Sequence, residues 1–281
     1  EASPLIQLQE IEEKKEKEKK VEKYLGLDKE VSKNAPFAKL KRYNLEDKSE
    51  SAKDEKKIVM KNTNINKFIY KGKTLNFSLL QKIPRKRTVI PFTNSKFMDM
   101  FEKEQPVHIE IGIGKGRFIH TLAKDNPEIN FIGIEKFDSV IVRALEKAID
   151  EPLPNLKLIR VDAGAIPIIL KDHTVERVYL NFPDPWPKER HQKRRLTNRR
   201  FLKIYEDLLT DSGELHMKTD NKVLFDYSLE EIVFYDMELT TISRDLHNSD
   251  VNCNIMTEFE EKYSKRGNKI FKLTAIYKEK K

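Results

Sequence analysis

The sequence contains 281 residues, of which 36% are charged and 38% are hydrophobic, and its formal net charge is +8. This apolar content is low for a chain that folds throughout, so we expect part of it to remain unpacked. The single cysteine excludes an internal disulfide and a cysteine-rich metal site, and no apolar run reaches the length of a membrane span. The excess of positive charge favours a polyanionic partner.

The first part of the chain differs in composition from the rest. Residues 1–60 are rich in charge and poor in aromatic side chains, which predicts an extension that is disordered or marginally helical, with a surface helix at 10–23. Residues 61–105 carry ten lysines or arginines against three acidic residues, with aromatic residues between them. This basic arm suits RNA binding, and it equally suits packing on the main domain. The alternation at 67–70 indicates a short strand.

From residue 106 to residue 281, short apolar runs alternate with amphipathic segments. The expected strands cover 107–111, 130–134, 156–161, 175–180 and 214–217. The expected helices cover 115–124, 138–149, 197–209 and 221–235. This alternation predicts an α/β fold in which a mostly parallel sheet is covered on both faces. Two further strands, at 237–243 and 269–277, would add an antiparallel edge at the C-terminal end and bring the sheet to seven strands.

The first of these strands runs into a glycine-rich turn, where Glu110 precedes Gly112, Gly114 and Gly116. Glycines here allow a tight turn and the close approach of a ligand to the following helix. A dinucleotide-binding turn has the spacing G-x-G-x-x-G instead, and a carboxylate at Glu110 would repel a pyrophosphate. The same carboxylate suits a cationic amino-acid group, such as the methionyl ammonium of S-adenosylmethionine. A nucleotide-dependent dehydrogenase is therefore the least favoured function.

Two more acids follow the next two strands. Glu135 lies about twenty residues after the glycines, where a carboxylate accepts hydrogen bonds from ribose hydroxyls. Asp162 ends the third strand and is placed to accept from an adenine amino group. Each acid alone is also compatible with a helix N-cap. Three acids at the carboxyl ends of three successive strands favour a ligand site in the crevice of an open sheet.

The most distinctive stretch covers residues 181–195 and begins Asn-Phe-Pro-Asp-Pro-Trp-Pro. Its prolines exclude a helix and predict a stiff loop that carries Asp184 and Trp186. A dense basic run follows, opposed only by Glu189. A rigid polar site beside a cationic surface suits an enzyme that acts on nucleic acid. An ordinary proline-rich turn beside a solvated charge run remains the alternative. For Trp186 we favour a role in anchoring the loop, and stacking on a ligand is the other interpretation.

Together these motifs resemble the bacterial tRNA (guanine-N7-)-methyltransferase family over about residues 107–277. The resemblance rests on the glycine-rich turn, on Gly133-Ile-Glu135, and on the proline–tryptophan loop with its basic run. It also rests on Lys218-Thr-Asp220-Asn and on the segment from Asn254 to Glu260. It covers none of residues 1–88. Members of the family commonly have tyrosine where this chain has Phe259, so a hydroxyl is absent there while the ring is kept.

The resemblance implies a Rossmann-like class I methyltransferase fold, S-adenosylmethionine as cofactor and a guanine in the tRNA variable loop as substrate. The cofactor would be held by Glu110, Gly112, Gly114, Gly116, Glu135, Asp162 and Asp184. The guanine nucleotide would be held by Lys188, Asp220, Thr257, Glu258, Phe259 and Glu260. RNA would meet Arg190, His191, Gln192, Lys193, Arg194 and Arg195.

The chemistry of guanine N7 makes Asp184 the expected catalytic residue. N7 carries a lone pair and no proton, so it attacks a sulfonium methyl without prior deprotonation, and the site needs orientation and charge placement. The product base is cationic, so a nearby carboxylate stabilises the charge that develops. Asp184 is equally placed to accept from the guanine N1–H or amino group. Thr257 and Glu260 have the spacing of a capping box, so a purely structural role is the alternative for that segment.

Two other functions compete with this one. A methyltransferase acting on an exocyclic amine of RNA would use an Asn-Pro-Pro-aromatic motif, which Asp184 interrupts here. An RNA-binding assembly factor with a vestigial cofactor site would have lost its acids, yet Glu110, Glu135, Asp162 and Asp184 are all present. The histidines lack metal-like spacing. We expect a cytoplasmic enzyme that works on tRNA as a monomer or homodimer, with no metal and no membrane.

Overall fold

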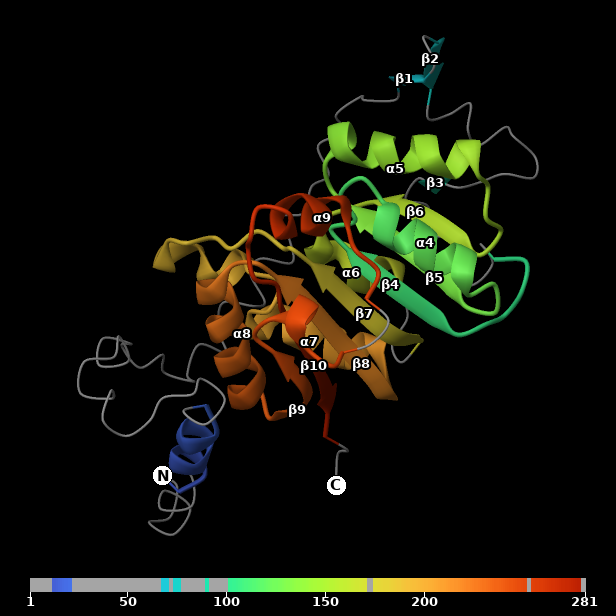
Figure 1. Ribbon diagram of the computed structural model, residues 1–281. Helices are drawn as coiled ribbons and strands as arrows, with labels where there is room; N and C mark the ends of the chain where they lie inside the picture. The colour runs from blue at the N-terminus through green and yellow to red at the C-terminus, as the bar shows by residue number, and fades with distance from the viewer. Residues whose placement is uncertain are drawn as a thin grey trace. The chain divides into compact units, whose positions relative to one another are not determined.

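The computed structural model describes residues 12–21, 67–70, 73–76, 89–90, 101–170, 174–251 and 254–278 (Figure 1). By its internal contacts the chain divides between Asn66 and Lys67. In the first unit, residues 12–21 form a helix, within the segment expected to be helical. Most of the expected extension (1–60) and much of the basic arm (61–105) lie outside the described residues, so their boundaries remain predictions.

In the second unit, eight strands form one sheet in the order β3-β6-β5-β4-β7-β8-β10-β9. Their bounds are β3 (Val89–Ile90), β4 (Val107–Ile111), β5 (Asn130–Glu135), β6 (Leu156–Arg160), β7 (Val175–Asn181), β8 (Leu209–Thr219), β9 (Met237–Ser243) and β10 (Phe271–Tyr277). Strands β3 to β8 pair in parallel, and β10 is antiparallel to both β8 and β9. The seven expected strands and their antiparallel edge are therefore confirmed.

The basic arm contributes strands of its own. Its two-residue strand β3 pairs with β6 and extends the sheet by one edge strand. A separate antiparallel pair consists of β1 (Lys67–Tyr70) and β2 (Lys73–Asn76), which confirms the short strand expected at 67–70. Part of the basic arm thus belongs to the main sheet, as expected if the arm packs on the main domain.

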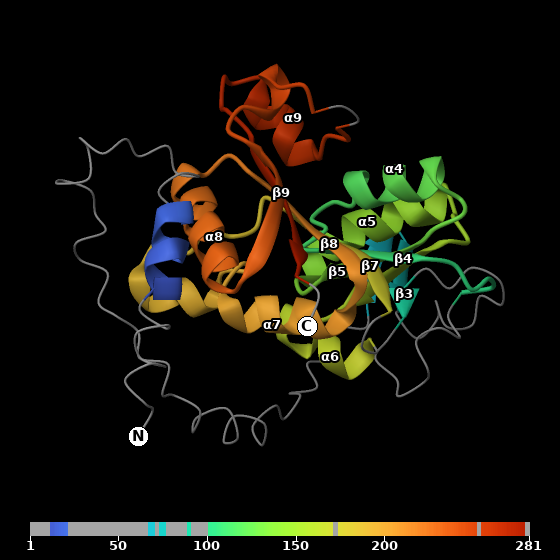
Figure 2. The ribbon, with the colours of Figure 1, turned by 90° about the horizontal axis from the view of Figure 1, so that it is seen from below.

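Helices cover both faces of the sheet (Figure 2). The helices are α4 (Arg117–Asp125), α5 (Asp138–Asp150), α6 (Ile166–Ile169), α7 (Arg199–Leu208), α8 (Lys222–Phe234) and α9 (Glu258–Ser264). Helices α4 and α5 pack together on one face, over β5 and β6, and α7 contacts α6 and α8 on the other. The described residues also form short 3-10 helices at η4 (Ala163–Ala165), η5 (Glu189–Arg194) and η6 (Leu246–Asn248).

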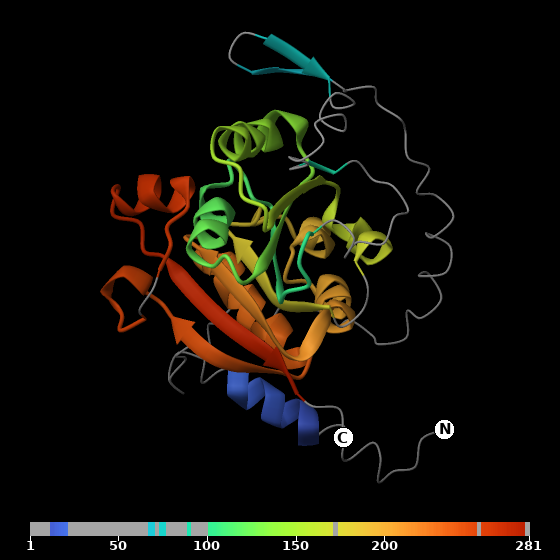
Figure 3. The same ribbon diagram turned by 90° about the vertical axis from the view of Figure 1, so that its right-hand side faces the viewer.

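The sheet places the site through its strand directions. Every residue of β4 and β5 is buried, so these strands form the centre of the core. The carboxyl ends of β4 to β8 point to one edge, where the loops after them gather. Helix α9 lies beside α4 near that edge (Figure 3). In the described part of the chain, no helix is long and apolar enough to cross a membrane, and no cluster of His, Cys, Asp or Glu side chains could hold a metal ion.

Candidate active site

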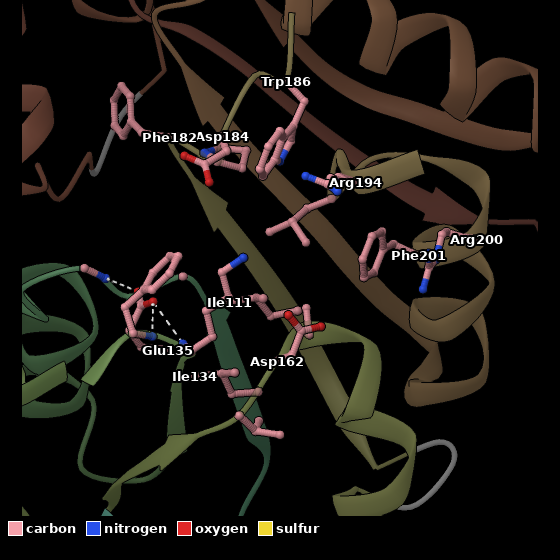
Figure 4. Close-up of a pocket in the computed structure, with 18 of the residues that line it drawn as sticks. Ile111, Ile134, Glu135, Asp162, Phe182, Asp184, Trp186, Arg194, Arg200 and Phe201 are labelled. Atoms are coloured by element: carbon pink, nitrogen blue, oxygen red, sulfur yellow. Dashed lines mark hydrogen bonds between the residues drawn. The ribbon is translucent and has the colours of Figure 1, made fainter. Parts of the chain in front are cut away.

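A cavity of about 470 Å³ opens at the carboxyl ends of β4 to β7. This volume lies within the usual range for a small-molecule pocket, roughly 300–1,000 Å³. Two of the three acids expected at the strand ends, Glu135 and Asp162, line it together with Asp184 of the proline loop (Figure 4). Gly112 and Gly114 line it as well. The fold therefore brings most of the predicted cofactor residues around one space.

The glycines of the turn after β4 have two different roles. Gly112 and Gly114 have left-handed φ angles of +81° and +56°, and a Cβ built on either would meet nothing within 4 Å. The space in front of them is thus open to a ligand. Gly116 also has a positive φ but does not line the cavity, and a Cβ there would lie 2.6 Å from the Cβ of Ala144. Gly116 therefore allows α4 to pack closely on α5.

The carboxylate of Glu135 ties two loops of the cavity wall together. Its Oε2 accepts from the backbone N–H of Gly114 (3.2 Å), and its Oε1 accepts from those of Lys136 (2.9 Å) and Phe137 (3.1 Å). Asp162 lines the cavity and also caps η4, since its Oδ1 accepts from the N–H of Gly164 at 2.9 Å. Capping by Asp162 is thus observed, and its contact with a ligand remains a prediction.

Glu110 is placed differently from the other acids. Its side chain is buried, it does not line the cavity, and its Oε1 accepts from Nδ2 of Asn181 at 2.8 Å. Its Oε2 is buried and has no hydrogen-bond partner in the described part of the chain. Glu110 thus lies in the core on β4, just before the glycine-rich turn, and not on the cavity wall. Its direct contact with a cofactor remains a prediction.

Glu110 should make the stability of the fold depend on pH. Burial raises its pKa to about 8, against the opposing effects of the Asn181 hydrogen bond and the Lys218 charge. A carboxyl whose pKa is raised in the folded state makes its full contribution to folding stability below its ordinary pKa of 4.5. That stability is lost as the pH rises towards 8. We expect Glu110→Gln to raise the free energy of unfolding at about pH 8.5 and to leave it nearly unchanged at about pH 5.

Urea titrations across this range measure the effect. The parent should lose stability more steeply than the variant as the pH rises, by about 1.4 kcal/mol per pH unit. Equal slopes would contradict a neutral Glu110 in the folded protein.

The proline loop after β7 holds Asp184 between two strained aromatic residues. Phe182 and Trp186 have left-handed φ angles of 52° and 41°. Such a conformation costs a non-glycine residue about 1–3 kcal/mol and is common at functional sites. The rings of these residues lie on opposite sides of the exposed carboxylate of Asp184 (Figure 4). As expected, the residues from Pro183 to Pro187 form neither helix nor strand.

Arg195 fixes this loop from within the protein. It is only 4% exposed, and its guanidinium donates to the carbonyls of Pro185 (3.0 Å) and Trp186 (3.1 Å). The same group lies 4.2 Å from the centre of the Tyr227 ring on α8. Arg195 is therefore committed to contacts within the chain, whereas an RNA-binding surface needs accessible cations.

The rest of the basic run is accessible or partly accessible. Lys193 and Arg194 are exposed and line the cavity, and Arg194 lies 4.9 Å from the centre of the Trp186 ring. The His191 ring contacts the same indole edge-on at 5.7 Å. Arg194 and His191 of the basic run thus contact the Trp186 ring, which also lines the cavity. The ring is therefore anchored and at the same time accessible to a ligand. Arg190 and Gln192 lie on the same 3-10 helix, η5.

The segment at α9 is anchored to the core by Glu260. Thr257 caps the helix, since its Oγ1 accepts from the N–H of Glu260 at 2.9 Å. The carboxylate of Glu260 is fully buried and accepts from Lys218 (2.6 Å), Asn254 (2.6 Å) and His247 (2.9 Å). Burial alone would raise the pKa of Glu260, but Lys218 and the other donors hold it below its ordinary value. Only half of the expected capping box forms, because Glu260 turns inward.

The other expected substrate residues lie outside the cavity wall. Glu258 pairs with Lys147 of α5 at 2.7 Å, and Asp220 accepts from Asn268 at 3.0 Å. Phe259 is 40% exposed on the surface of α9. Lys188 is exposed at the start of η5. Their contacts with a nucleotide remain predictions.

Several residues of the cavity wall were not expected. These are Ile111, Ile134, Lys136, Phe137, Val161, Ala163, Phe182, Pro183, Leu196, Arg200 and Phe201. Phe137 is 52% exposed although it is a large aromatic residue, and it follows Glu135 by two positions. The position of Phe137 just after the strand-end acid Glu135 is the sequence signal that could have identified it as a residue of the cavity wall. Arg200 and Phe201 come from the start of α7, which no local motif connects with the strand ends.

Comparison with known proteins supports a methyltransferase fold for this chain. A family model described as "Putative methyltransferase" matches residues 104–273. The fold is similar to that of the 16S rRNA methyltransferase KamB, with a TM-score of 0.53 at 15% identity, over 69% of this chain and 100% of that one. It is also similar to an antibiotic-related methyltransferase, with a TM-score of 0.51 at 17% identity, over 68% of this chain and 96% of that one. At such identity these likenesses concern the fold, and they confirm the Rossmann-like methyltransferase architecture.

The cavity fits the cofactor of such an enzyme, S-adenosylmethionine. The open space before Gly112 and Gly114 allows a ligand to approach the backbone, and the acids at three strand ends suit a molecule with hydroxyl and amino donors and a net positive charge. Because the matched family model covers more than half of the chain, the chain is an S-adenosylmethionine-dependent methyltransferase that belongs to the family of the tRNA (guanine-N7-)-methyltransferases.

Proposed function

We propose that this enzyme methylates N7 of a guanine in the variable loop of tRNA. The observation that carries the proposal is the position of Asp184, an exposed carboxylate on the cavity wall in a loop stiffened by prolines and held by Arg195. Membership of the family supports the same substrate.

The site has the groups that this reaction needs. Bound S-adenosylmethionine supplies an electrophilic methyl group on a sulfonium. Asp184 stabilises the positive charge that develops on the base, and the aromatic residues on either side restrict where the base enters. The cofactor would lie along Gly112, Gly114, Glu135 and Asp162. No strong base is required, because N7 carries no proton.

Methylation of an exocyclic amine is less well supported. In that reaction an amide oxygen in the loop accepts a hydrogen bond from the amine. The corresponding amide here, that of Asn181, is buried, donates to Glu110 and does not line the cavity.

The test uses labelled S-adenosylmethionine with unmodified tRNA and, separately, with 16S rRNA, followed by nucleoside analysis of each digest. We expect label in 7-methylguanosine from tRNA alone. Label in another nucleoside, or in rRNA in preference to tRNA, would overturn the proposed target.

Two adjacent arginines should separate RNA binding from loop positioning. We expect Arg194→Ala to raise the Michaelis constant for tRNA and to reduce the salt dependence of tRNA binding by about 0.7–0.9 unit, the value for one lost phosphate contact. Arg195→Ala should instead lower kcat and destabilise the fold by roughly 2–4 kcal/mol, because two charged hydrogen bonds and a ring contact are lost from a buried site.

Steady-state kinetics at several salt concentrations distinguish the two variants, and urea titration gives the stability. Arg195→Lys serves as a matched control. One ammonium cannot reproduce the planar fork that serves both carbonyls, so this variant should recover only part of the loss. If Arg195→Ala changes the salt dependence of tRNA binding and leaves kcat and stability intact, Arg195 binds RNA and does not position the loop.

A further inference from the structure

A row of aromatic side chains leads from the cavity onto α9. The rings of Phe182 and Phe259 lie 4.8 Å apart between centroids at an angle of 41°, and those of Phe259 and Tyr263 are stacked at 4.1 Å and 28°. Phe259 and Tyr263 are four residues apart on α9 and therefore share one face of the helix. Phe182 lines the cavity. We call these three residues the aromatic row.

Two cations accompany the outer end of the row. Nζ of Lys262 lies 5.4 Å from the centre of the Tyr263 ring, and Cζ of Arg266 lies 5.2 Å from it. Both side chains are exposed, and neither forms an ion pair with another described residue. In contrast, Lys265 on the same helix pairs with Glu261. Two exposed cations thus contact the Tyr263 ring, and both are available to an anionic partner.

Helix α9, which carries two of the three rings, is anchored to neighbouring elements by three carboxylates. Glu260 is buried under α9 with Lys218, Glu258 pairs with Lys147 of α5, and Glu261 pairs with Arg117 of α4. Phe259 lies among these anchored acids, yet it is 40% exposed. A single exposed apolar residue is ordinary, but a stack of rings beside unpaired cations has the features of a single-stranded nucleic-acid surface.

We propose that the aromatic row stacks an unpaired base next to the target guanine, with Lys262 and Arg266 facing its phosphates. This rests on the proposed function, because the target guanine is placed by Asp184, next to Phe182 in the same cavity wall. Single-stranded RNA is recognised mainly through unstacked bases on aromatic rings and through phosphate contacts. The exposed positive charge of Lys262 and Arg266, which both contact the Tyr263 ring, suits phosphates better than an apolar partner.

The experiment measures equilibrium binding of an unmodified tRNA transcript to the full chain, without requiring methylation. We expect Phe259→Ala to weaken binding by about 10- to 100-fold, the usual effect of removing one base–aromatic stack. Phe259→Tyr keeps the ring and should bind like the parent. Val223→Ala, an exposed apolar change on α8, serves as the control. Affinity for S-adenosylmethionine should be unchanged in all three.

Transcripts with an abasic nucleotide on the 5′ or the 3′ side of the target guanine identify the stacked base. In the parent, one of them should weaken binding by the same factor as Phe259→Ala, and combining the two changes should cause no further loss. Parental affinity of Phe259→Ala, or fully additive losses at both positions, would overturn the aromatic row as a base site. Absence of 7-methylguanosine from the parent's product would instead refute the proposed function and leave the binding result to be judged separately.

Discussion

We expect Asp184→Asn to lower the rate of methyl transfer to tRNA about 100-fold or more while both ligands still bind. Asparagine keeps the shape of the side chain, and the loop is held by Arg195 and by prolines, so the fold and the cavity should persist. What is lost is the negative charge beside a base that becomes cationic. Removal of one such electrostatic partner typically costs about 3–4 kcal/mol in the transition state.

Single-turnover kinetics with saturating tRNA and S-adenosylmethionine measure this rate without interference from product release. Asp211→Asn, which removes an exposed carboxylate from β8 away from the cavity wall, is the matched control and should react at the parental rate. A rate within about twofold of the parent for Asp184→Asn would remove Asp184 from the mechanism, since a charge contact of this kind is worth far more.

The largest effect on stability should come from Glu260. Glu260→Gln leaves the ammonium of Lys218 in a buried site without its counter-charge at 2.6 Å. Removal of one partner of a buried ion pair destabilises a protein by about 3–5 kcal/mol. The resemblance to the family implies that Glu260 holds the guanine nucleotide, whereas its full burial and its three donors indicate that it anchors α9.

Urea unfolding measures this loss. Glu146→Gln breaks an exposed pair with Arg143 on α5 and should change stability by less than about 1 kcal/mol. The double variant Lys218→Met, Glu260→Leu removes both charges and should recover much of the loss, because the desolvation cost disappears with them. If Glu260→Gln is as stable as the parent but binds tRNA poorly, Glu260 acts as a ligand and not as an anchor.

Local pattern was enough to predict the features that lie at strand ends. Glu135 is the last residue of β5 and Asp162 lies two residues after β6, so parallel pairing of these strands brings both acids to one edge of the sheet. The stiffness of the proline loop follows in the same way from its composition. The start of β8 at Leu209 could not be predicted, because Asp211 and Ser212 in this strand are exposed and interrupt its apolar pattern.

Contacts between distant segments could not be predicted from the sequence. Arg195 stands in a run of basic residues and has the composition of a solvated surface, yet Tyr227 and the loop carbonyls bury it. The inward turn of Glu260 depends on Lys218, which lies 42 residues away along the chain. Gly116 belongs to the glycine motif, but its role is set by the approach of Ala144 on α5. In each case the deciding partner comes from another element.

If guanine N7 is the reacting atom, a single atomic substitution in the substrate should abolish methyl transfer. A tRNA in which the target guanine is replaced by 7-deazaguanine keeps the base pairing edge and the exocyclic amine but has a C–H group in place of N7. With labelled S-adenosylmethionine, we expect this tRNA to bind like the unmodified transcript and to take up no label. Uptake of label at the parental rate would contradict the claim and place the reaction at another atom.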